Sequence, residues 1–565
     1  MKKRLIAFLM AAAMTALAMA ACGAPAGQQA STAATTAATT AAPEATEPAT
    51  SAETAAPAET SAAPSEPATQ TEASGGGEKQ YITLHLPSNP TMLDPALTSD
   101  GQGGILAFMM EPIMRVDKDY KLIPGIAESY ESNEDATVYT YKIRSGVKFH
   151  DGTDCDAEAI KWNYERQIGD NATPDMPYAA TIFSKVEKVE APDATTLVIT
   201  LSEPDGTLPT YLAMPNGTAI VSPTAWQADP SGFQKKPVGA GPYTFVEWIE
   251  DQSVKLDANP SYYGGEVMNA GVNFKVIKEP SVLTSEYLAG GVDHINNINY
   301  ADIDQIEGAG FQVRSRPNLG YGFLSFADYE SNELFKDERL RQAVAHALDR
   351  KALVNGIYSG RMNVAYAPIP IGMYGGDAAY TVYEYDVEKA KALMADAGYP
   401  DGFEFDFVTR SEPEYSTMAA AVQMELAKVG ITMNVEILQK AEWLDKVFME
   451  VPDHDMISFN WGAAANDPSY MAALWLSSNA GTGYNTSGYS NPEFDSLIDS
   501  ARKTADTAEQ GRLYAQAAQM VNDDAACVFL QEQTYFWSTR DSIVDPEGNI
   551  GSFHTNAWWM CSKTN

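Results

Sequence analysis

Cysteine and histidine are scarce in this chain, with 4 cysteines and 6 histidines in 565 residues. The three cysteines beyond residue 100 are Cys155, Cys527 and Cys561, which are far apart and form no Cys-x-x-Cys pattern. This spacing argues against a metal site and allows at most one disulfide. Cys527 lies in an apolar run, residues 525–530, so we expect it to be a buried free thiol.

Positive charge is also in short supply, since 38 lysines and arginines face 75 acidic residues and give a formal net charge of -37. Such a surface repels phosphate backbones and anionic lipids, which excludes nucleic-acid or membrane binding over a broad face. A DNA-binding regulator is the least favoured class, because the chain has no basic N-terminal domain and carries an export signal.

Catalytic motifs are missing as well. The sequence contains no GxSxG elbow, no HExxH or HxxEH pair and no Walker motif. Asp453-His454-Asp455 is the densest group of metal-ligand types, but adjacent residues entering a strand point to alternate sides. We therefore expect a protein that is not an enzyme and needs no metal or cofactor. An extracellular hydrolase with an undetected carboxylate pair stays as an alternative.

Bulky apolar side chains are absent from residues 23–79, a tract of Ala, Thr, Pro, Ser and Glu that cannot form a core and is predicted to be disordered. Lys2, Lys3 and Arg4 and then an apolar run precede it, which is the pattern of a signal peptide over residues 1–21. Met19-Ala20-Ala21-Cys22 resembles a lipobox. We expect acylation of Cys22 and a tethering linker over 22–79, the alternative being an ordinary signal peptide with Cys22 incidental.

What is present suits a large globular protein. The length predicts two or more domains, and 45% hydrophobic residues are ample for their cores. Residues 81–86 and 138–143 alternate as strands do, and Asp156 is placed to cap a helix that carries Ile160 and Tyr164 on one face. His150 stands at a Gly turn, where a structural role is the favoured interpretation.

The second half has the pattern of an α/β domain. Residues 403–408, 417–429 and 431–437 read as a β-α-β unit, and residues 337–357 as one helix in which His346 is a packing residue. A helix over 387–397 has Asp386 as its cap and Gly398 as its end. Residues 321–326, 456–461 and 528–537 read as strands.

Six stretches taken together resemble one protein family: residues 126–160, 237–248, 259–265, 335–353, 385–400 and 489–498. They are similar to signatures of the family 5 extracellular solute-binding proteins, the peptide, nickel and oligosaccharide receptors of ABC importers. The resemblance runs from about Ile82 to the C-terminus.

This resemblance implies an α/β, bilobed periplasmic-binding-protein-like fold, with two lobes joined by two crossing strands and an extra inserted subdomain. Lobe I would comprise residues 80–110, 237–316 and 533–565, the inserted subdomain 111–236, and lobe II 317–532. Closure of the lobes would trap a solute. A ligand favours closure only by binding the closed state with greater affinity than the open state. The protein would be a monomer outside the cytoplasmic membrane that delivers its solute to ABC permease subunits.

The family's site is similar to the run from Trp461 to Pro468. In peptide-binding relatives an Asp in that run takes the ligand ammonium, and here Ala464 stands in its place. The dipeptide receptors place an Arg pair where this chain has Ser416 and Thr417. The resemblance therefore implies a peptide ligand, though not a free dipeptide held by both ends.

Aromatic and amide side chains remain as candidates for ligand contact, with an oligosaccharide or other neutral metabolite as the alternative ligand and a peptide-pheromone sensor as an alternative role. Arg410 is a possible substitute for the missing carboxylate anchor. The predicted ligand-binding residues are Gln102, Tyr374, Arg410, Trp443, Trp461, Asn466, Tyr470, Tyr484 and Asn485. For each aromatic ring, simple core packing is an equally good interpretation.

Overall fold

Three sheets organise the part of the chain that a computed structural model describes. The described residues are 78–98, 103–118, 120–327, 332–376, 380, 383–449, 454–463, 466–480, 485–546, 548 and 557–564. The predicted signal peptide, Cys22 and the linker up to residue 77 lie outside them. No helix among these residues is both long and apolar enough to cross a membrane.

The first sheet is built from the N-terminal strand and three strands that follow some 150 residues later in the chain. Its order is β1-β10-β9-β8, with β1 (Tyr81–Leu86) parallel to β10 (Gly271–Val276). The other strands are β9 (Ser253–Ala258) and β8 (Tyr243–Ile249). The stretch after residue 237 therefore contributes three strands to the sheet that begins with residues 81–86.

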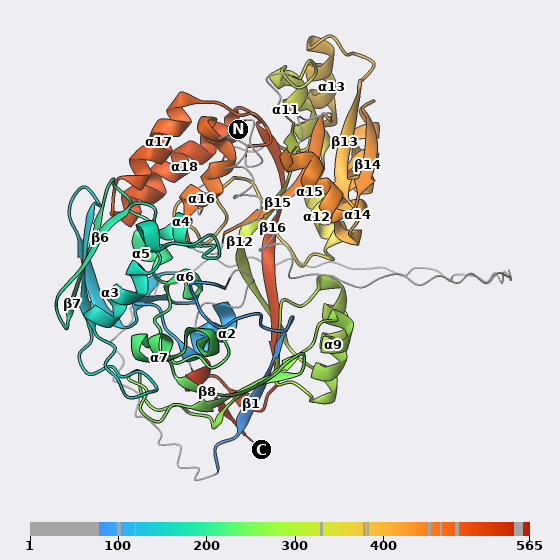
Figure 1. Cartoon of the computed structure of the whole chain (residues 1–565). Helices are drawn as coiled ribbons and strands as arrows, with labels where there is room; N and C mark the ends of the chain where they lie inside the picture. The colour runs from blue at the N-terminus through green and yellow to red at the C-terminus, as the bar shows by residue number, and fades with distance from the viewer. Residues whose placement is uncertain are drawn as a thin grey trace, which may run out of the picture. The chain divides into compact units, whose positions relative to one another are not determined.

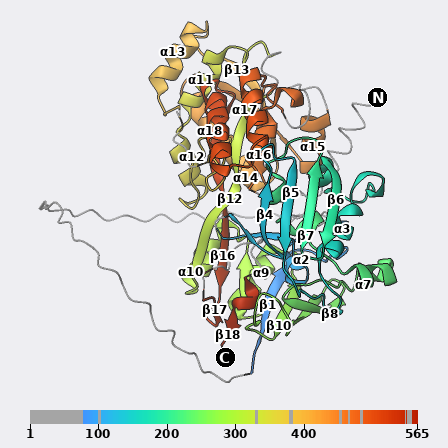
Figure 2. The same cartoon turned by 90° about the vertical axis from the view of Figure 1, so that its left-hand side faces the viewer.

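The second sheet lies wholly within the sequence between β1 and β8. Its antiparallel order is β4-β5-β7-β6, and α3 (Ala157–Glu165) packs on β6 and β7 (Figure 2). Asp156 accepts a hydrogen bond from the Ala159 N–H, which confirms the predicted cap. The strands are β4 (Ala127–Ser132), β5 (Val138–Ile143), β6 (Val186–Asp193) and β7 (Thr196–Leu201).

A buried ion pair ties this second sheet's helix to the loop after β1. Asp94 is fully buried and accepts bonds of 2.6 and 2.8 Å from Arg166, and Trp226 donates a third at 2.9 Å. Burial by itself would raise the pKa of Asp94, but the Arg166 guanidinium and these hydrogen bonds outweigh it and lower that pKa. The fixed charge positions α3 against the first sheet.

The third sheet contains two long strands that pass from one core to another. Its order is β11-β16-β12-β15-β13-β14. Strands β12 and β16 are antiparallel neighbours in this sheet and cross the centre of the view in Figure 1. Tyr535 and Trp537 of β16 belong to the core around the first sheet, whereas Val528 and Leu530 belong to the core of the C-terminal half. One strand thus joins two separately packed bodies. The bounds are β11 (His294–Asn296), β12 (Val313–Phe326), β13 (Glu404–Arg410), β14 (Thr432–Leu438), β15 (Met456–Gly462) and β16 (Cys527–Thr539).

Helices of the first half connect and cover the first two sheets, and two short ladders complete this part. The helices are α2 (Gly103–Met109), α4 (Ala179–Phe183), α5 (Leu208–Tyr211), α6 (Pro215–Thr218), α7 (Pro223–Ala228), α8 (Pro230–Phe233), α9 (Pro280–Ala289) and α10 (Ile303–Gly308). The ladders are β2 (Met114–Val116) with β3 (Leu122–Pro124), and β17 (Ile543–Val544) with β18 (Ser562–Lys563).

Helices of the second half surround the third sheet. They are α11 (Glu338–Ala347), α12 (Arg350–Ile357), α13 (Val387–Asp396), α14 (Pro413–Ala427), α15 (Lys440–Met449), α16 (Pro468–Ala472), α17 (Pro492–Arg502) and α18 (Thr507–Asp523). Strands β13 and β14 are parallel with α14 between them, which confirms the predicted β-α-β unit. The lobe boundaries given above stay predictions.

Two helix predictions in this half were wrong in detail. Residues 337–357 form two helices, because Leu348 is extended and the Asp349 carboxylate caps the second by accepting from the Ala352 N–H. Helix α14 begins at Pro413 and not at Thr417. Proline suits the first helical position, because the backbone N–H that it lacks would have no intrahelical partner there.

The cysteines and histidines singled out in the sequence are structural. Cys155, Cys527 and Cys561 are all buried and free, which confirms the prediction for Cys527. His150 is bonded between two backbone groups, with Nε2 2.9 Å from the Gly241 carbonyl oxygen, and burial lowers its pKa. His346 Nδ1 lies 2.6 Å from the Glu384 carbonyl oxygen, in agreement with a packing role.

Candidate polar pocket of the second lobe

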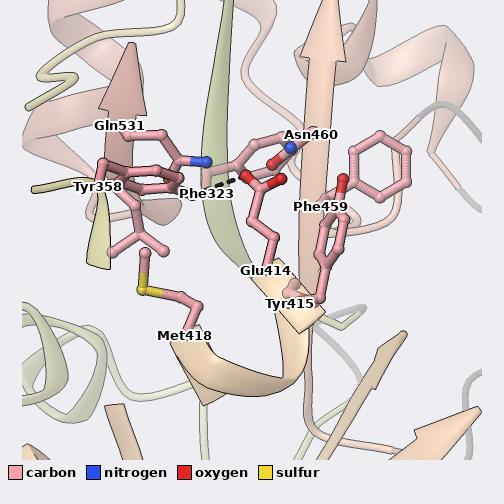
Figure 3. Close-up of a pocket in the computed structure, with 10 residues that line it drawn as sticks. Phe323, Tyr358, Glu414, Tyr415, Met418, Phe459, Asn460 and Gln531 are labelled. Carbon is pink, nitrogen blue, oxygen red and sulfur yellow. Dashed lines mark hydrogen bonds between the residues drawn. The ribbon is translucent and has the colours of Figure 1, made fainter. Parts of the chain in front are cut away.

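A pocket opens where the first turn of α14 approaches strands β15 and β16 (Figure 3). The space between its walls is about that of one water molecule. Its walls mix aromatic rings with amide, hydroxyl and carboxylate groups. The lining residues are Phe323, Tyr358, Glu414, Tyr415, Met418, Ser458, Phe459, Asn460, Leu530 and Gln531.

Two side-chain amides meet above Gly322 of β12. A Cβ atom at Gly322 would lie 2.3 Å from Gln531 Nε2 and 2.6 Å from Asn460 Oδ1, so only glycine leaves room for both. Gln531 is 4% exposed, and its buried Oε1 has no hydrogen-bond partner. Nor does the Asn460 side chain bond to any residue that the structure describes. Because a buried amide oxygen without a partner is costly, Gln531 and the partly buried Asn460 beside it are suited to a polar ligand group.

Glu414 brings a carboxylate to the same pocket. Its Oε1 accepts a hydrogen bond of 2.7 Å from the Tyr358 hydroxyl. Burial and the neighbouring Glu414 charge raise the pKa of Tyr358, so this phenol stays protonated and donates. The Tyr358 ring is itself held edge-on by Tyr300 at 5.1 Å. The carboxylate is therefore positioned by a buried and packed donor.

Arg410, the suggested substitute carboxylate anchor, lies at the end of β13 and already has partners. Its guanidinium stacks 3.7 Å from the Tyr415 ring centre and 5.2 Å from that of Trp443. Its Nε is 3.6 Å from a Glu412 oxygen. With its charge compensated by Glu412, Arg410 is poorly placed to take a ligand carboxylate.

Three predicted aromatic residues form one packed series with Phe459. Ring centres are 5.4 Å apart for Trp443 and Phe459, 6.0 Å for Phe459 and Trp461, and 5.0 Å for Trp461 and Tyr470. Trp443 and Trp461 are 3% and 7% exposed and belong to the core of the second half. The structure therefore brings Arg410, Trp443, Trp461 and Tyr470 together, but as a wall packed behind the pocket.

Asn466 lies elsewhere, where the tip of the β2–β3 hairpin meets the second half of the chain. Its Nδ2 donates to the carbonyl oxygens of Tyr120 at 3.4 Å and Gly372 at 3.3 Å, while its buried Oδ1 has no partner. Tyr374 follows Gly372 in the same loop and is partly buried. These residues form a second group, separate from the polar pocket's lining.

Asn485 is bonded on both sides by its own loop. Its amide donates to the Leu476 and Tyr489 carbonyl oxygens, and its Oδ1 accepts from Ser487 and from the Tyr489 N–H. This network holds a turn together and leaves little for a ligand.

The remaining predicted positions divide into those described and those not. Gln102, Tyr484 and Ala464 lie outside the described residues. Ser416 and Thr417 are inside α14, where the Ser416 hydroxyl lies 3.3 Å from the Pro413 carbonyl oxygen. Neither supplies the charge that an arginine pair would.

Metal binding finds no support among the residues that the structure describes, since no group of three or more His, Cys, Asp or Glu side chains gathers there. Asp455 accepts bonds from Asn332 Nδ2 and from the Asp406 N–H, so its carboxylate has a structural role.

The family model of the bacterial extracellular solute-binding proteins, family 5 middle region, matches residues 121–483. The chain belongs to this family. Its members have the bilobed α/β fold, and the prediction of an extracellular solute receptor of an ABC importer is confirmed. The matched range contains Glu414 and Asn460, while Gln531 and the end of β16 lie beyond it.

Relatives of this family 5 protein match most of its length. The probable D,D-dipeptide-binding periplasmic protein DdpA of Escherichia coli (strain K12) is 29% identical over 471 residues, 81% of this chain and 89% of that protein. Heme-binding protein A of Haemophilus influenzae is 27% identical over 501 residues, 83% and 89% of the two chains. The structure of HbpA2 from Haemophilus parasuis shares the fold, with a TM-score of 0.78, 24% identity and coverage of 86% and 100%.

The pocket's polar residues were missed by sequence reasoning. Glu414 follows Pro413, which marks a helix start, and that signal would have placed it in a first turn facing the strand ends. No such signal existed for Asn460 and Gln531, because their meeting depends on how β12 pairs with both β15 and β16.

Proposed function

We propose that this family 5 receptor captures a peptide-like solute, one group of which enters the polar pocket, and hands it unchanged to an ABC importer. The amide pair of Asn460 and Gln531 over Gly322 carries this proposal. Each amide offers donors and an acceptor, which is what the N–H and C=O groups of a peptide backbone require. The relative DdpA, named for D,D-dipeptides, agrees with a peptide-like ligand.

The receptor works as a monomer on the outer face of the cytoplasmic membrane. Acylation of Cys22 anchors it, and residues 22–79 let the folded part reach about 40 Å from the membrane on average. The membrane contact is through the lipid alone, because the strongly acidic chain is repelled by anionic headgroups.

Mass spectrometry of the solute that purifies with the protein tests this function. We expect an intact molecule with several amide bonds. An oligosaccharide in its place would contradict the peptide-like ligand. Cleavage of the bound solute at a rate proportional to protein concentration would show an enzyme instead.

A further inference from the structure

A contact away from the crossing strands also joins the region of the second sheet to the C-terminal half. It lies where the loop after β7 meets the turn between α17 and α18 (Figure 1). The Gly206 N–H donates a 2.7 Å hydrogen bond to the Arg502 carbonyl oxygen. Ala505, in the same turn, packs against the hydrophobic core of the second sheet. Two segments far apart in the sequence are therefore in direct contact.

Gly206 allows this contact because it has no side chain. A Cβ atom there would lie 2.0 Å from the Thr504 carbonyl oxygen and 2.6 Å from Gln510 Nε2. Gln510 is buried, and its Nε2 donates to the same Thr504 oxygen at 2.8 Å. Neither a backbone oxygen nor a bonded, buried amide has room to move aside. Only glycine therefore lets the two segments approach this closely.

The Tyr211 hydroxyl makes a second contact between the same two regions. It donates a 2.7 Å hydrogen bond to Asp467 Oδ2, and Asp467 is 2% exposed. The other oxygen of Asp467 accepts from the Ser469 N–H at the start of α16. A hydrogen bond to a carboxylate is stronger than one between neutral groups, so this contact adds to the first.

Each side of the contact is held firmly within its own region. The Asp205 carbonyl oxygen accepts from the Tyr139 hydroxyl at 2.7 Å, and the Asp205 N–H donates to the Ala136 carbonyl oxygen at 3.0 Å. On the other side, Ile498 of α17 and Tyr514 of α18 belong to the core of the C-terminal half. The contact therefore joins two packed bodies and not two loose loops.

We infer that this contact is a clamp, which holds the region of the second sheet against the C-terminal half before any solute binds. Gly206 and Tyr211 form one side of it, and Arg502 and Asp467 form the other. None of these four residues lines the polar pocket, so the clamp is independent of the function proposed above. A solute acts on an equilibrium between arrangements of the two bodies that the clamp has already shifted.

Hydrogen exchange at two neighbouring amides tests the clamp in the solute-free protein. The Gly206 N–H bonds across the contact, whereas the Asp205 N–H bonds to Ala136 within its own region. Tyr211→Phe removes one bond of the clamp and should speed exchange at Gly206 about ten- to hundredfold, with exchange at Asp205 unchanged. Tyr399→Phe is the control, because this exposed tyrosine's hydroxyl bonds to no residue that the structure describes, and neither amide should respond.

Two results of this experiment overturn the clamp. If both amides exchange faster in Tyr211→Phe, the loop after β7 frays by itself while the two bodies stay together. If exchange at Gly206 is the same as in the natural protein, the bond to Asp467 does not hold the two regions together.

The distance between the two bodies provides a separate measurement. Electron–electron double resonance records it between spin labels at Glu187→Cys on β6 and Ala392→Cys on α13, which are exposed positions, in a Cys22→Ser background. The other cysteines are buried. We expect a narrow distribution of distances without solute, and a broader one after Gly206→Ala. Gly356→Ala, where nothing lies within 4 Å of a Cβ, should keep the narrow distribution.

A distribution that Gly206→Ala leaves unchanged would show that the clamp does not restrain the two bodies. A distribution that is already broad in the natural protein would show the same. Urea unfolding establishes that Gly206→Ala folds, and if it does not fold, the exchange experiment with Tyr211→Phe decides the question.

Discussion

At the scale of single residues, the most unusual group is the buried carboxyl of Glu532 in β16. It is 5% exposed and stands opposite Tyr321 in the ladder, and its Oε2 has no hydrogen-bond partner. Burial raises the pKa of Glu532 to about 8, and the Ile371 backbone N–H offsets only part of this effect. The folded protein therefore holds a proton that the unfolded chain releases.

The stability of the fold should fall as pH rises from about 4.5 to about 8, because over that interval only the folded state keeps this proton. Glu532→Gln removes the ionisable group and should therefore remove this pH-dependent loss of stability, which is roughly 3–5 kcal/mol at pH 8. Urea unfolding at pH 5 and pH 8 measures it. Glu187→Gln, at an exposed position on β6, should change nothing, and a natural protein equally stable at both pH values would contradict the assignment.

A second residue-scale expectation concerns the ligand carboxylate. Arg410 is compensated by Glu412, and Ser416 and Thr417 carry no charge, so a buried carboxylate would be left unpaired at a cost of about 3–5 kcal/mol. The affinity of this protein for free dipeptides should therefore be about two to four decades lower than that of a receptor that has a carboxylate anchor.

Calorimetric titration of dipeptides and their C-terminal amides checks this expectation. The amides should bind at least as well as the free acids to the natural protein. The double variant Ser416→Arg and Thr417→Arg should reverse that order. Submicromolar binding of any free dipeptide to the natural protein would contradict this expectation. Arg410 would then be the carboxylate anchor to test.

At the scale of elements, the pocket depends on how three strands of one sheet are paired. β12 pairs with β15 on one side and β16 on the other, which sets the Asn460 and Gln531 side chains above Gly322. The first turn of α14 then brings Glu414 to the same place. The site is thus built on rigid elements and not on long loops.

Gly322→Ala should damage binding more than stability. The added Cβ would meet the ends of two flexible side chains, which can turn away at a cost of about 1 kcal/mol but then no longer point into the pocket. We expect at least a tenfold loss of affinity for a tetrapeptide amide, measured by calorimetry beside urea unfolding.

Gly308→Ala is the matched control, since nothing lies within 4 Å of a Cβ at that helical position. It should leave the affinity unchanged and raise the free energy of unfolding by about 0.4–1 kcal/mol, because alanine lowers the entropy of the unfolded chain. If Gly322→Ala also binds normally, the amide pair does not contact the ligand.

At the scale of the whole molecule, two bodies share the pair of crossing strands. The region around the second sheet also contacts the C-terminal half, where the Tyr211 hydroxyl donates a 2.7 Å hydrogen bond to buried Asp467. A solute moves such a pair of bodies toward closure only through its greater affinity for the closed arrangement. The polar pocket is lined by residues of the C-terminal half only, so closure requires contacts from the other body.

The tether is the other whole-molecule expectation. Cys22→Ser should release the mature protein into the medium, because a lipid anchor needs the thiol. Fractionation of cells with and without a salt wash measures this. Protein that stays with the membrane after the wash would show that Cys22 is incidental.

Local patterns in the sequence were enough to determine many elements. Strands over 81–86 and 138–143, the caps at Asp156 and Asp386 and the turn at Gly398 are as expected, because alternation, capping and left-handed glycine act within a few residues. The composition and six short signatures together indicated the fold class and the class of function.

Only the tertiary structure decided the pocket. The helix predicted over 337–357 is interrupted at Leu348, whose backbone is extended, and nothing in the spacing of its apolar residues indicated the interruption. Trp443 and Trp461 have the residue types of a ligand cleft, yet they lie in the core. Asn460 and Gln531 are unremarkable in sequence and meet only through strand pairing across long sequence separations. Hydrophobic pattern specifies which face is buried, whereas the position of a polar side chain in a pocket depends on register between distant strands.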